Sequence, residues 1–439
     1  MNISPQRRQE IIDALRRGTV PKNHLDTFAV GLERFEGALD AELQTAKMGG
    51  SGFKAVRGEY GCGKTFFARW LADRARRVGF ATSEVQVSET ETPLHRLETV
   101  YRRLIERLAT VDTNSGALRN ILDSWFYTLE EDVLAEGTID PNDEAALLKR
   151  TSEFLEQKLS RVADSAPMFS AALRGYRQAQ SEGDQATADS ILAWLSGQPN
   201  VAAAAKRYAG VKGDIDHFGA LNFLQGVLTI LRDSGHAGLL IVLDEVETIQ
   251  RVRSDVRDKS LNALRQLIDE IDAGRFPGLY LVITGTPAFF ESPQGVQRLE
   301  PLAQRLHTDF QTDAKFDNPR AQQIRLPAFQ HDRLFEVGTK VRAVYQQHCA
   351  SNERIAEVCD DDLIHGLAHA VTGKLGGKVG VAPRIFLKKL VADVLDRIDQ
   401  FPDFDPRSDY SLSITEEELS PVERQAMSAT SVDEIELDL

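Results

Sequence analysis

The octet GEYGCGKT at residues 58–65 constrains the fold of this 439-residue chain more than any other feature. It has the spacing G-x-x-x-x-G-K-[ST], the pattern of a loop that cradles phosphate groups. Glycines have no Cβ, so the backbone can turn sharply and point successive N–H groups at an anion. Lys64 would add a positive charge for the β- and γ-phosphates, and the Thr65 hydroxyl could ligate Mg²⁺.

The segments beside the octet predict a strand before it and a helix after it. Residues 53–57 form a short buried run, and after Thr65 apolar residues recur at helical spacing, as in Phe66 and Trp70. Bound phosphates would therefore meet a helix N-terminus, where the helix dipole favours negative charge. We predict a nucleotide site formed by the loop and the first helical turn, with the residues Glu59, Tyr60, Gly61, Cys62, Gly63, Lys64, Thr65 and Phe66.

A second hydrophobic run ends in two carboxylates. The segment GLLIVLDEVE, residues 238–247, is typical of a buried strand that ends at Asp244 and Glu245. The carboxyl end of such a strand lies beside the phosphate loop. We predict that Asp244 holds Mg²⁺ through water and that Glu245 is the general base for the attacking water. Glu247 could support the site or be a solvated helix-start residue, and we favour the solvated interpretation.

Four further polar residues are candidates because of their places in the pattern. Thr284 and Thr286 follow the apolar run 279–283, where a hydroxyl could sense the γ-phosphate or position the water. Arg305 lies near the end of a predicted helix, from which it could reach the γ-phosphate of a neighbouring subunit. Arg384 stands in the first turn of a later helix that begins with proline, where it could touch the bound triphosphate.

Short runs of β-forming residues alternate with helical stretches, which is typical of a parallel α/β sheet. The predicted strands are 53–57, 80–88, 239–243, 279–284 and 323–326. Lys64 and Asp244 are 180 positions apart, whereas two strand–helix units need about 60 residues. The surplus has helical periodicity, and it would be either an ordinary helical subdomain or a partner-binding insertion.

Composition favours a cytoplasmic protein without a generally basic surface. The net charge is −14, but residues 403–439 carry eleven acidic residues and two arginines, so −9 belongs to this end and only −5 to the remainder. A local basic groove is therefore possible. Three cysteines without a CxxC pair favour a reducing compartment. Cys62 is expected to be a small packed side chain, not a redox switch. No apolar run approaches the ~20 residues of a membrane helix.

The order of these motifs resembles that of AAA+ ATPases. In that family the corresponding features are Walker A, Walker B, sensor 1, the arginine finger and sensor 2. The likeness covers residues 17–398, and it implies that Val30, in the segment FAVG, packs on adenine. The chain departs from the origin-recognition branch at sensor 1, where that branch usually has Asn and this sequence has Thr.

Four segments resemble more narrowly the BrxD-type ATP-binding proteins of bacteriophage-exclusion (BREX) defence systems. They are RRGTVPKNHLDTFAVG, GEYGCGKTFF, GLLIVLDEVETI and ITEEELSP. The resemblance implies ATP and Mg²⁺ as cofactors, and ATP hydrolysis that drives or licenses an antiphage complex acting on DNA. It also implies other BREX proteins as partners and a homo-oligomer in which Arg305 acts in trans. Two alternatives remain, a nucleotide-controlled switch or scaffold with slow turnover and an origin-recognition-like DNA loader.

The expected organisation has five parts. They are an N-terminal helical part with the adenine-pocket segment (1–50), an AAA+ α/β core (51–110 and 216–328), a helical insertion (111–215), a helical lid with sensor 2 (329–400) and an acidic tail (401–439). The tail could shield a basic groove, dock on a partner through Ile435, Leu437 and Leu439, or only be a solubilising end.

Overall fold

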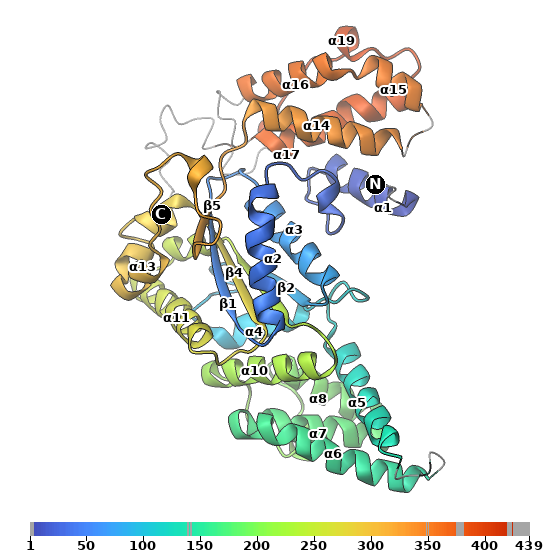
Figure 1. Ribbon diagram of the computed structural model, residues 1–439, viewed down its shortest axis with the longest axis vertical. Coiled ribbons are helices and arrows are strands. Elements are labelled where there is room, and N and C mark those ends of the chain that lie inside the picture. The colour runs from blue at the N-terminus through green and yellow to red at the C-terminus, as the bar shows by residue number, and fades with distance from the viewer. Residues whose placement is uncertain are drawn as a thin grey trace.

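The centre of the protein is a five-stranded, wholly parallel sheet (Figure 1). The structure is a computed structural model that describes residues 4–137, 140, 143–347, 349, 351–374, 382–418 and 424. The strands are β1 (Gly52–Arg57), β2 (Ala81–Gln86), β3 (Leu239–Asp244), β4 (Leu279–Gly285) and β5 (Gln323–Arg325), in the spatial order β2-β3-β4-β1-β5. The predicted α/β class and its five parallel strands are confirmed, with strand ends shifted by at most two residues.

Both faces of the sheet are buried because the strand side chains alternate between two cores. Ile241 and Leu281 are paired in register and belong to one core. Val242 and Val282, the next pair, belong to the other. A parallel sheet that is covered on both faces needs apolar residues at successive positions, which explains why LLIVL and LYLVI show no alternation.

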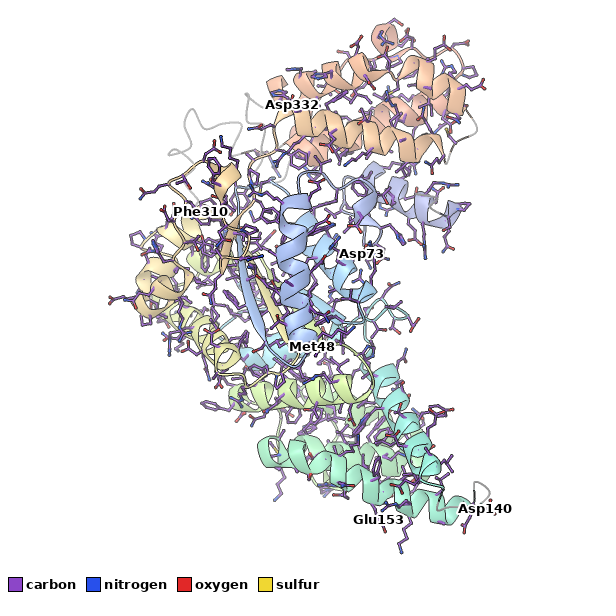
Figure 2. The ribbon with its side chains drawn as sticks, viewed as in Figure 1. Met48, Asp73, Asp140, Glu153, Phe310 and Asp332 are labelled. Carbon is purple, nitrogen blue, oxygen red and sulfur yellow. The ribbon has the colours of Figure 1, made fainter. Side chains whose placement is uncertain are left out.

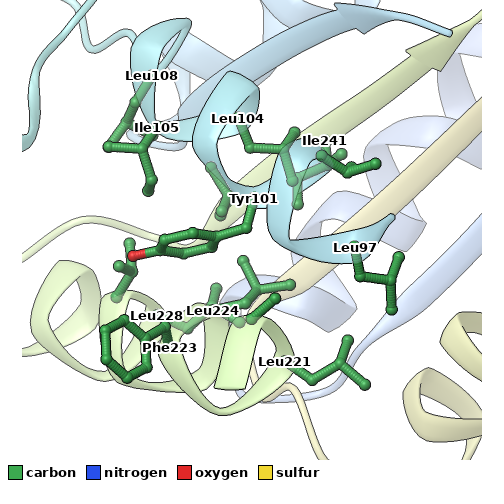
Figure 3. Close-up of a cluster of buried hydrophobic side chains, with 14 of the residues drawn as sticks. Leu97, Tyr101, Leu104, Ile105, Leu108, Leu221, Phe223, Leu224, Leu228 and Ile241 are labelled. Carbon is green, nitrogen blue, oxygen red and sulfur yellow. The ribbon is translucent and has the colours of Figure 1, made fainter. Parts of the chain in front are cut away.

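Helices form a layer on each face of the sheet. On one face lie α2 (Glu33–Lys47) and α3 (Lys64–Arg77), and on the other lie α4 (Leu97–Glu106), α10 (His217–Asp233) and α11 (Ser254–Asp272). Figure 3 shows the contact between α4 and α10, where the ring of Tyr101 lies among leucine side chains. The Tyr101 hydroxyl donates to the carbonyl of Leu195 at 2.7 Å, so its polar atom is satisfied inside the core.

Five helices fill the stretch predicted to be a helical insertion. They are α5 (Leu118–Ala135), α6 (Glu144–Ser165), α7 (Pro167–Ser181), α8 (Gln185–Leu195) and α9 (Ala203–Tyr208). Their buried residues join the core on the α4 and α10 face of the sheet, so this segment shares a core with the sheet. Figure 2 labels Glu153 in this segment and Asp332 in the lid at opposite ends of the molecule.

The lid is a small helical unit that also holds the first helix of the chain. It contains α14 (His331–Gln346), α15 (Asn352–Val358), α16 (Asp361–Lys374), α17 (Ala382–Lys388), the π-helical segment η6 (Lys389–Leu395) and α18 (Asp396–Gln400), against which α1 (Pro5–Arg16) packs. Arg16 donates to Asp396 from Nε at 2.6 Å and from Nη2 at 2.8 Å. Helix α1 therefore lies with the lid, whereas α2 lies on the sheet.

The chain returns over the lid after α18. It forms α19 (Pro406–Asp409) and the short turn η7 (Glu416–Glu418). Tyr410 donates to Asp393 at 3.2 Å, and Arg354 donates to the carbonyl of Phe404 at 2.8 Å. The predicted docking residues 435–439 lie outside the described residues. Among the described residues, no helix combines the length and the apolarity required to cross a membrane.

Candidate nucleotide-binding site

The octet forms a tight loop between β1 and α3. Gly61 and Gly63 have φ angles of 78° and 95°, which glycine adopts without strain. A Cβ on Gly58 would lie 2.3 Å from the Sγ of Cys62, so the loop is also closely packed inside. Burial raises the pKa of the Cys62 thiol to about 11, and the thiol therefore stays protonated at neutral pH.

The ammonium group of Lys64 is held by the loop that precedes it. Its Nζ donates to the carbonyl oxygens of Gly58 at 2.8 Å and Glu59 at 3.2 Å, and lies 5.0 Å from the ring centroid of Tyr60. The Lys64 residue is only 7% exposed. A buried cation whose hydrogen-bond partners are neutral carbonyls is a strong attractor for a phosphate that enters the loop.

The polar ends of β3 and β4 form one hydrogen-bonded cluster with the start of α3. Thr65 Oγ1 donates to one Asp244 oxygen at 2.9 Å, and the buried Thr284 hydroxyl donates to the other. Thr284 Oγ1 also accepts the backbone N–H of Glu245 at 3.1 Å. We call Thr65, Asp244, Glu245 and Thr284 the strand-edge group. Hydroxyl and carboxylate oxygens suit Mg²⁺, so Thr65 and Asp244 are the residues that would hold this ion beside the phosphates.

The two candidate threonines at the end of β4 have different surroundings. Thr284 belongs to the strand-edge group, whereas Thr286 is the N-cap of α12 (Pro287–Glu291) and accepts the N–H of Phe289 at 3.4 Å. Both side chains are buried. Thr284 is therefore the one that contacts Asp244 and the backbone of Glu245, whereas Thr286 lies between β4 and α12 and caps the helix.

Glu245 is held by a residue that the sequence did not single out. Gln86 donates from Nε2 to Oε2 of Glu245 at 2.7 Å. Glu245 itself has a φ of 59°, a left-handed backbone angle that is uncommon outside glycine. The only sequence signal for Gln86 is its place at the end of β2, where it pairs in register with Asp244 of β3.

Glu247 is buried next to the phosphate loop. It lies in η2 (Val246–Arg251) and is 4% exposed, so the solvated interpretation favoured from the sequence is wrong. Its Oε1 lies 4.0 Å from Lys64 Nζ, and neither carboxylate oxygen has a hydrogen-bond partner among the described residues. Burial raises the pKa of Glu247 to about 7, although the Lys64 charge acts in the opposite direction.

A cavity of about 270 Å³ opens beside the loop, and its walls are mainly apolar. Val30, which the family resemblance predicts to pack on adenine, is one of the lining residues. Phe66 also lines it and contacts Phe28 edge to face, with ring centroids 5.4 Å apart. Glu59 is exposed and contributes only its carbonyl to the loop. The combination of an apolar wall and a loop that binds anions suits a nucleotide base with its phosphates.

Two arginines of the lid line this cavity. Arg384 in α17 donates from Nη2 to the carbonyl oxygen of Glu418 at 2.7 Å. Arg333 in α14 lies over Gly31, where a Cβ would be 2.8 Å from the Arg333 Cζ. Sequence reasoning missed Arg333 because nothing in its local pattern indicates that the first lid helix meets the segment around Val30.

Arg305 is outside this cavity and on the surface of the core. It lies in α13 (Glu300–Leu306), and its guanidinium makes ion pairs with Asp269 at 2.8 Å and Asp272 at 2.6 Å, both in α11. The side chain is 37% exposed. This position is compatible with a role at a neighbouring chain, and a local ion pair accounts for it equally well.

A parallel sheet with a glycine loop between β1 and α3, and with a carboxylate at the end of β3, is the arrangement of P-loop nucleotide-binding proteins. The model of the family "BREX system ATP-binding protein BrxC/D" matches residues 3–414, so the chain belongs to this family. ATP is therefore its ligand, and its role is that of an ATP-binding component of a BREX phage-defence system, with other BREX components as partners. A search of individually curated proteins gave no match.

Proposed function

We propose that this protein is an AAA+ ATPase that hydrolyses ATP to drive or license a BREX complex acting on DNA in the cytoplasm. The observation that carries the proposal is the strand-edge group beside Lys64. Lys64 would contact the β- and γ-phosphates, Thr65 and Asp244 would hold Mg²⁺, and Glu245 would take a proton from the attacking water. The ion, when bound, would neutralise charge on the phosphate oxygens.

Hydrolysis requires the Glu245 carboxylate to face the water. Its backbone is fixed by the N–H bond to Thr284, whereas its carboxylate is held by Gln86 at an exposed position. Moving the carboxylate from Gln86 to the water is then a side-chain rotation. The cost is one exposed hydrogen bond, about 0.5–1.5 kcal/mol, which a bound nucleotide can offset.

A homo-oligomer would complete the site, with Arg305 reaching the γ-phosphate of the neighbouring subunit. Exposed ion pairs such as those of Arg305 with Asp269 and Asp272 contribute about 0–1 kcal/mol each. A triphosphate on the adjacent chain is therefore able to compete for this guanidinium. Arg384 would contact the triphosphate of its own chain from the lid.

A second candidate is a nucleotide-controlled switch with slow turnover. Two contacts favour it: Glu245 is held by Gln86, and Arg384 by the Glu418 carbonyl. In this state both groups needed for hydrolysis have protein partners. ATP binding would then change the lid without rapid cleavage.

Phosphate release by the full-length protein separates these candidates. Initial rates should be measured over a range of protein concentrations, with and without DNA, and Lys64→Ala should serve as the background control. The ATPase proposal expects a rate per chain that rises with concentration and increases further with DNA. A protein that binds ATP but shows the Lys64→Ala rate under all these conditions, also with its BREX partners, would instead be the switch.

A further inference from the structure

A second cavity, of about 620 Å³, lies beside β2 and does not overlap the nucleotide cavity. It lies between α3, the outer edge of β2, the segment that follows β2, and the end of α4. We call it the basic cavity, because its walls carry five cationic and two carboxylate side chains. These are Lys22, Arg69, Arg76, Arg103, Arg107, Glu84 and Glu91. Their net charge is +3, in a chain whose net charge is −14.

Two of these cations have no ion pair among the described residues. Arg69 pairs with Glu84 at 3.1 Å, and Arg103 lies 3.6 Å from Glu91, so both carboxylates of the wall are already engaged. Arg76 lies 3.7 Å from Asp73, which is not part of the wall. Lys22 and Arg107 remain, and both are exposed to the cavity mouth. The positive charge of the wall is therefore not balanced from within the wall.

Neutral hydrogen-bond donors surround this charge. The wall includes hydroxyl and amide side chains from two loops, namely Ser88, Thr90, Thr92, Asn114 and Ser115. The strand edge adds backbone donors. Thr82 N–H points to this edge, because it donates to Ala109 at 2.8 Å, and the alternation of the strand turns the N–H groups of Glu84 and Gln86 the same way. Apart from the bridge between Thr82 and Ala109, no strand pairs with this edge in the described part of the chain.

The composition of the wall indicates which ligand fits. Cations together with hydroxyl, amide and backbone N–H donors are the groups that contact phosphate oxygens in nucleic-acid complexes. No aromatic residue among those that the structure describes lines the cavity, so bases would have no stacking surface and their identity would not be read. The volume exceeds that of the neighbouring nucleotide cavity, and so it has room for more than one phosphate group.

We propose that the basic cavity binds the phosphodiester backbone of a single nucleic-acid strand, independently of ATP. This inference gives a location to the DNA contact that the proposed function requires. It does not depend on hydrolysis, because Lys64 and the strand-edge group take no part in it.

The test is binding of a fluorescent, mixed-sequence single strand to the full-length protein without nucleotide, measured by anisotropy at several salt concentrations. The double variant Lys22→Ala/Arg107→Ala should bind about tenfold more weakly at low salt, because two phosphate contacts are lost. The slope of log K against log salt should fall by about 1.4, at roughly 0.7 per contact for a single strand. Both side chains are exposed, so folding should be unaffected, and a thermal melt verifies this.

The matched control removes cations elsewhere on the surface. Arg174→Ala/Arg253→Ala makes the same charge change at exposed positions outside the cavity and should bind like wild type. Lys64→Ala should also bind the strand normally, which separates a failure of this site from a failure of the ATPase proposal. Strands of different base composition should bind alike, and inorganic tripolyphosphate should compete with them.

Three results would overturn the proposal. The first is equal affinity and salt slope for wild type and Lys22→Ala/Arg107→Ala. The second is an equal loss of strand affinity in the control variant Arg174→Ala/Arg253→Ala, which would mean that overall charge, and not the basic cavity, explains the effect. The third is binding of tripolyphosphate, but not of the oligonucleotide, by Lys64→Ala protein, with this binding lost when Lys22→Ala/Arg107→Ala is added. Because the phosphate loop is disabled in this background, such a result would identify a small phosphorylated anion as the occupant of the basic cavity instead of a strand.

Discussion

The strand-edge group and the two candidate arginines are held in different ways within the same chain. Thr65, Asp244 and Thr284 bond to one another, so the geometry of the site is built before any ligand arrives. Arg305 and Arg384 instead bond to groups with no other part in the site, the acids of α11 and the carbonyl of Glu418. The sheet fixes the positions of the strand-edge residues, whereas the positions of the two guanidinium groups depend on which partners they contact.

This difference has a physical origin. Parallel strands in register bring their carboxyl ends to one edge, and buried hydrogen bonds there cost more to break than exposed ones. The guanidinium groups lie at the surface of the core and in the lid, where water and neighbouring charges compete for them. The comparison therefore predicts that binding is determined by the strand edge, and that turnover is adjusted by the arginines.

The largest effect is expected at Lys64. Lys64→Ala removes the buried charge that faces the phosphates, so the Kd for ATP should rise by about 100-fold or more, measured by calorimetry. Lys206→Ala, which removes a surface lysine paired with Asp214, is the control and should bind ATP normally. Tight ATP binding by the Lys64 variant would refute the nucleotide site.

Glu245→Gln should separate binding from hydrolysis. The amide cannot accept a proton from water, so turnover should fall by about 100-fold or more while ATP affinity stays near that of wild type. Phosphate release and calorimetry measure the two quantities. Normal turnover by this variant would exclude Glu245 as the general base and would direct attention to Glu247, the buried acid 4.0 Å from Lys64.

The arginine half of the comparison is tested by mixing subunits. Arg305→Ala and Lys64→Ala should each be inactive alone, yet regain some activity when mixed, because one interface then has an intact loop and an intact arginine. Arg298→Ala is a closely matched control, since Arg298 also pairs with an acid of α11, Asp258. No recovery in complexes that contain both chains would leave Arg305 as a surface ion pair.

The two threonines at the end of β4, Thr284 and Thr286, offer a matched pair with a smaller expected effect. Thr284→Val removes one of the two donors to Asp244 and leaves the Glu245 N–H without its acceptor, so turnover should fall by roughly tenfold. Thr286→Val removes a helix cap and should lower the free energy of unfolding by about 0.5–2 kcal/mol with little change in turnover. If both variants lose turnover equally, the distinction drawn from their contacts is wrong.

The smallest effect is expected at Glu418, whose carbonyl oxygen accepts the hydrogen bond from Arg384. Glu418 is partly buried, which raises its pKa, but hydrogen bonds from Lys389 and Lys388 outweigh this and hold it at about 2. Because the pKa of Glu418 in the folded protein is below its ordinary value, its ionised carboxylate contributes fully to the free energy of unfolding above about pH 4.5. This contribution is lost as the pH falls toward 2. Glu418→Gln should thus lower stability by about 1 kcal/mol at pH 7, with no difference near pH 2.

This Glu418 variant also bears on turnover. Loosening the turn that holds Arg384 should raise the ATPase rate by no more than about threefold if the Glu418 contact restrains the arginine. Glu417→Gln, a neighbouring exposed acid, is the control. A lower rate in the Glu418 variant would mean that this contact positions Arg384 instead of restraining it.

The sequence by itself determined the parts of the protein that depend on neighbours along the chain. The octet predicts a loop between a strand and a helix, because glycines and a lysine at that spacing are typical of phosphate-binding loops. The run LLIVLDE predicts a buried strand with acidic residues at its end. The five parallel strands follow from apolar runs that are too short and too β-rich for helices. The roles of the site residues stay predictions, although their placement agrees with the pattern that suggested them.

Only the tertiary structure decided which distant residues meet. Gln86 reaches Glu245 because β2 and β3 pair in one register, and Arg333 covers Gly31 because the lid folds over the N-terminal segment. The burial of Glu247 and the charge of the basic cavity have the same origin. The residues next to each of these positions in the sequence do not indicate the contact it makes. Packing of the whole core determines which distant elements pair, whereas local periodicity indicates only which face of an element is buried.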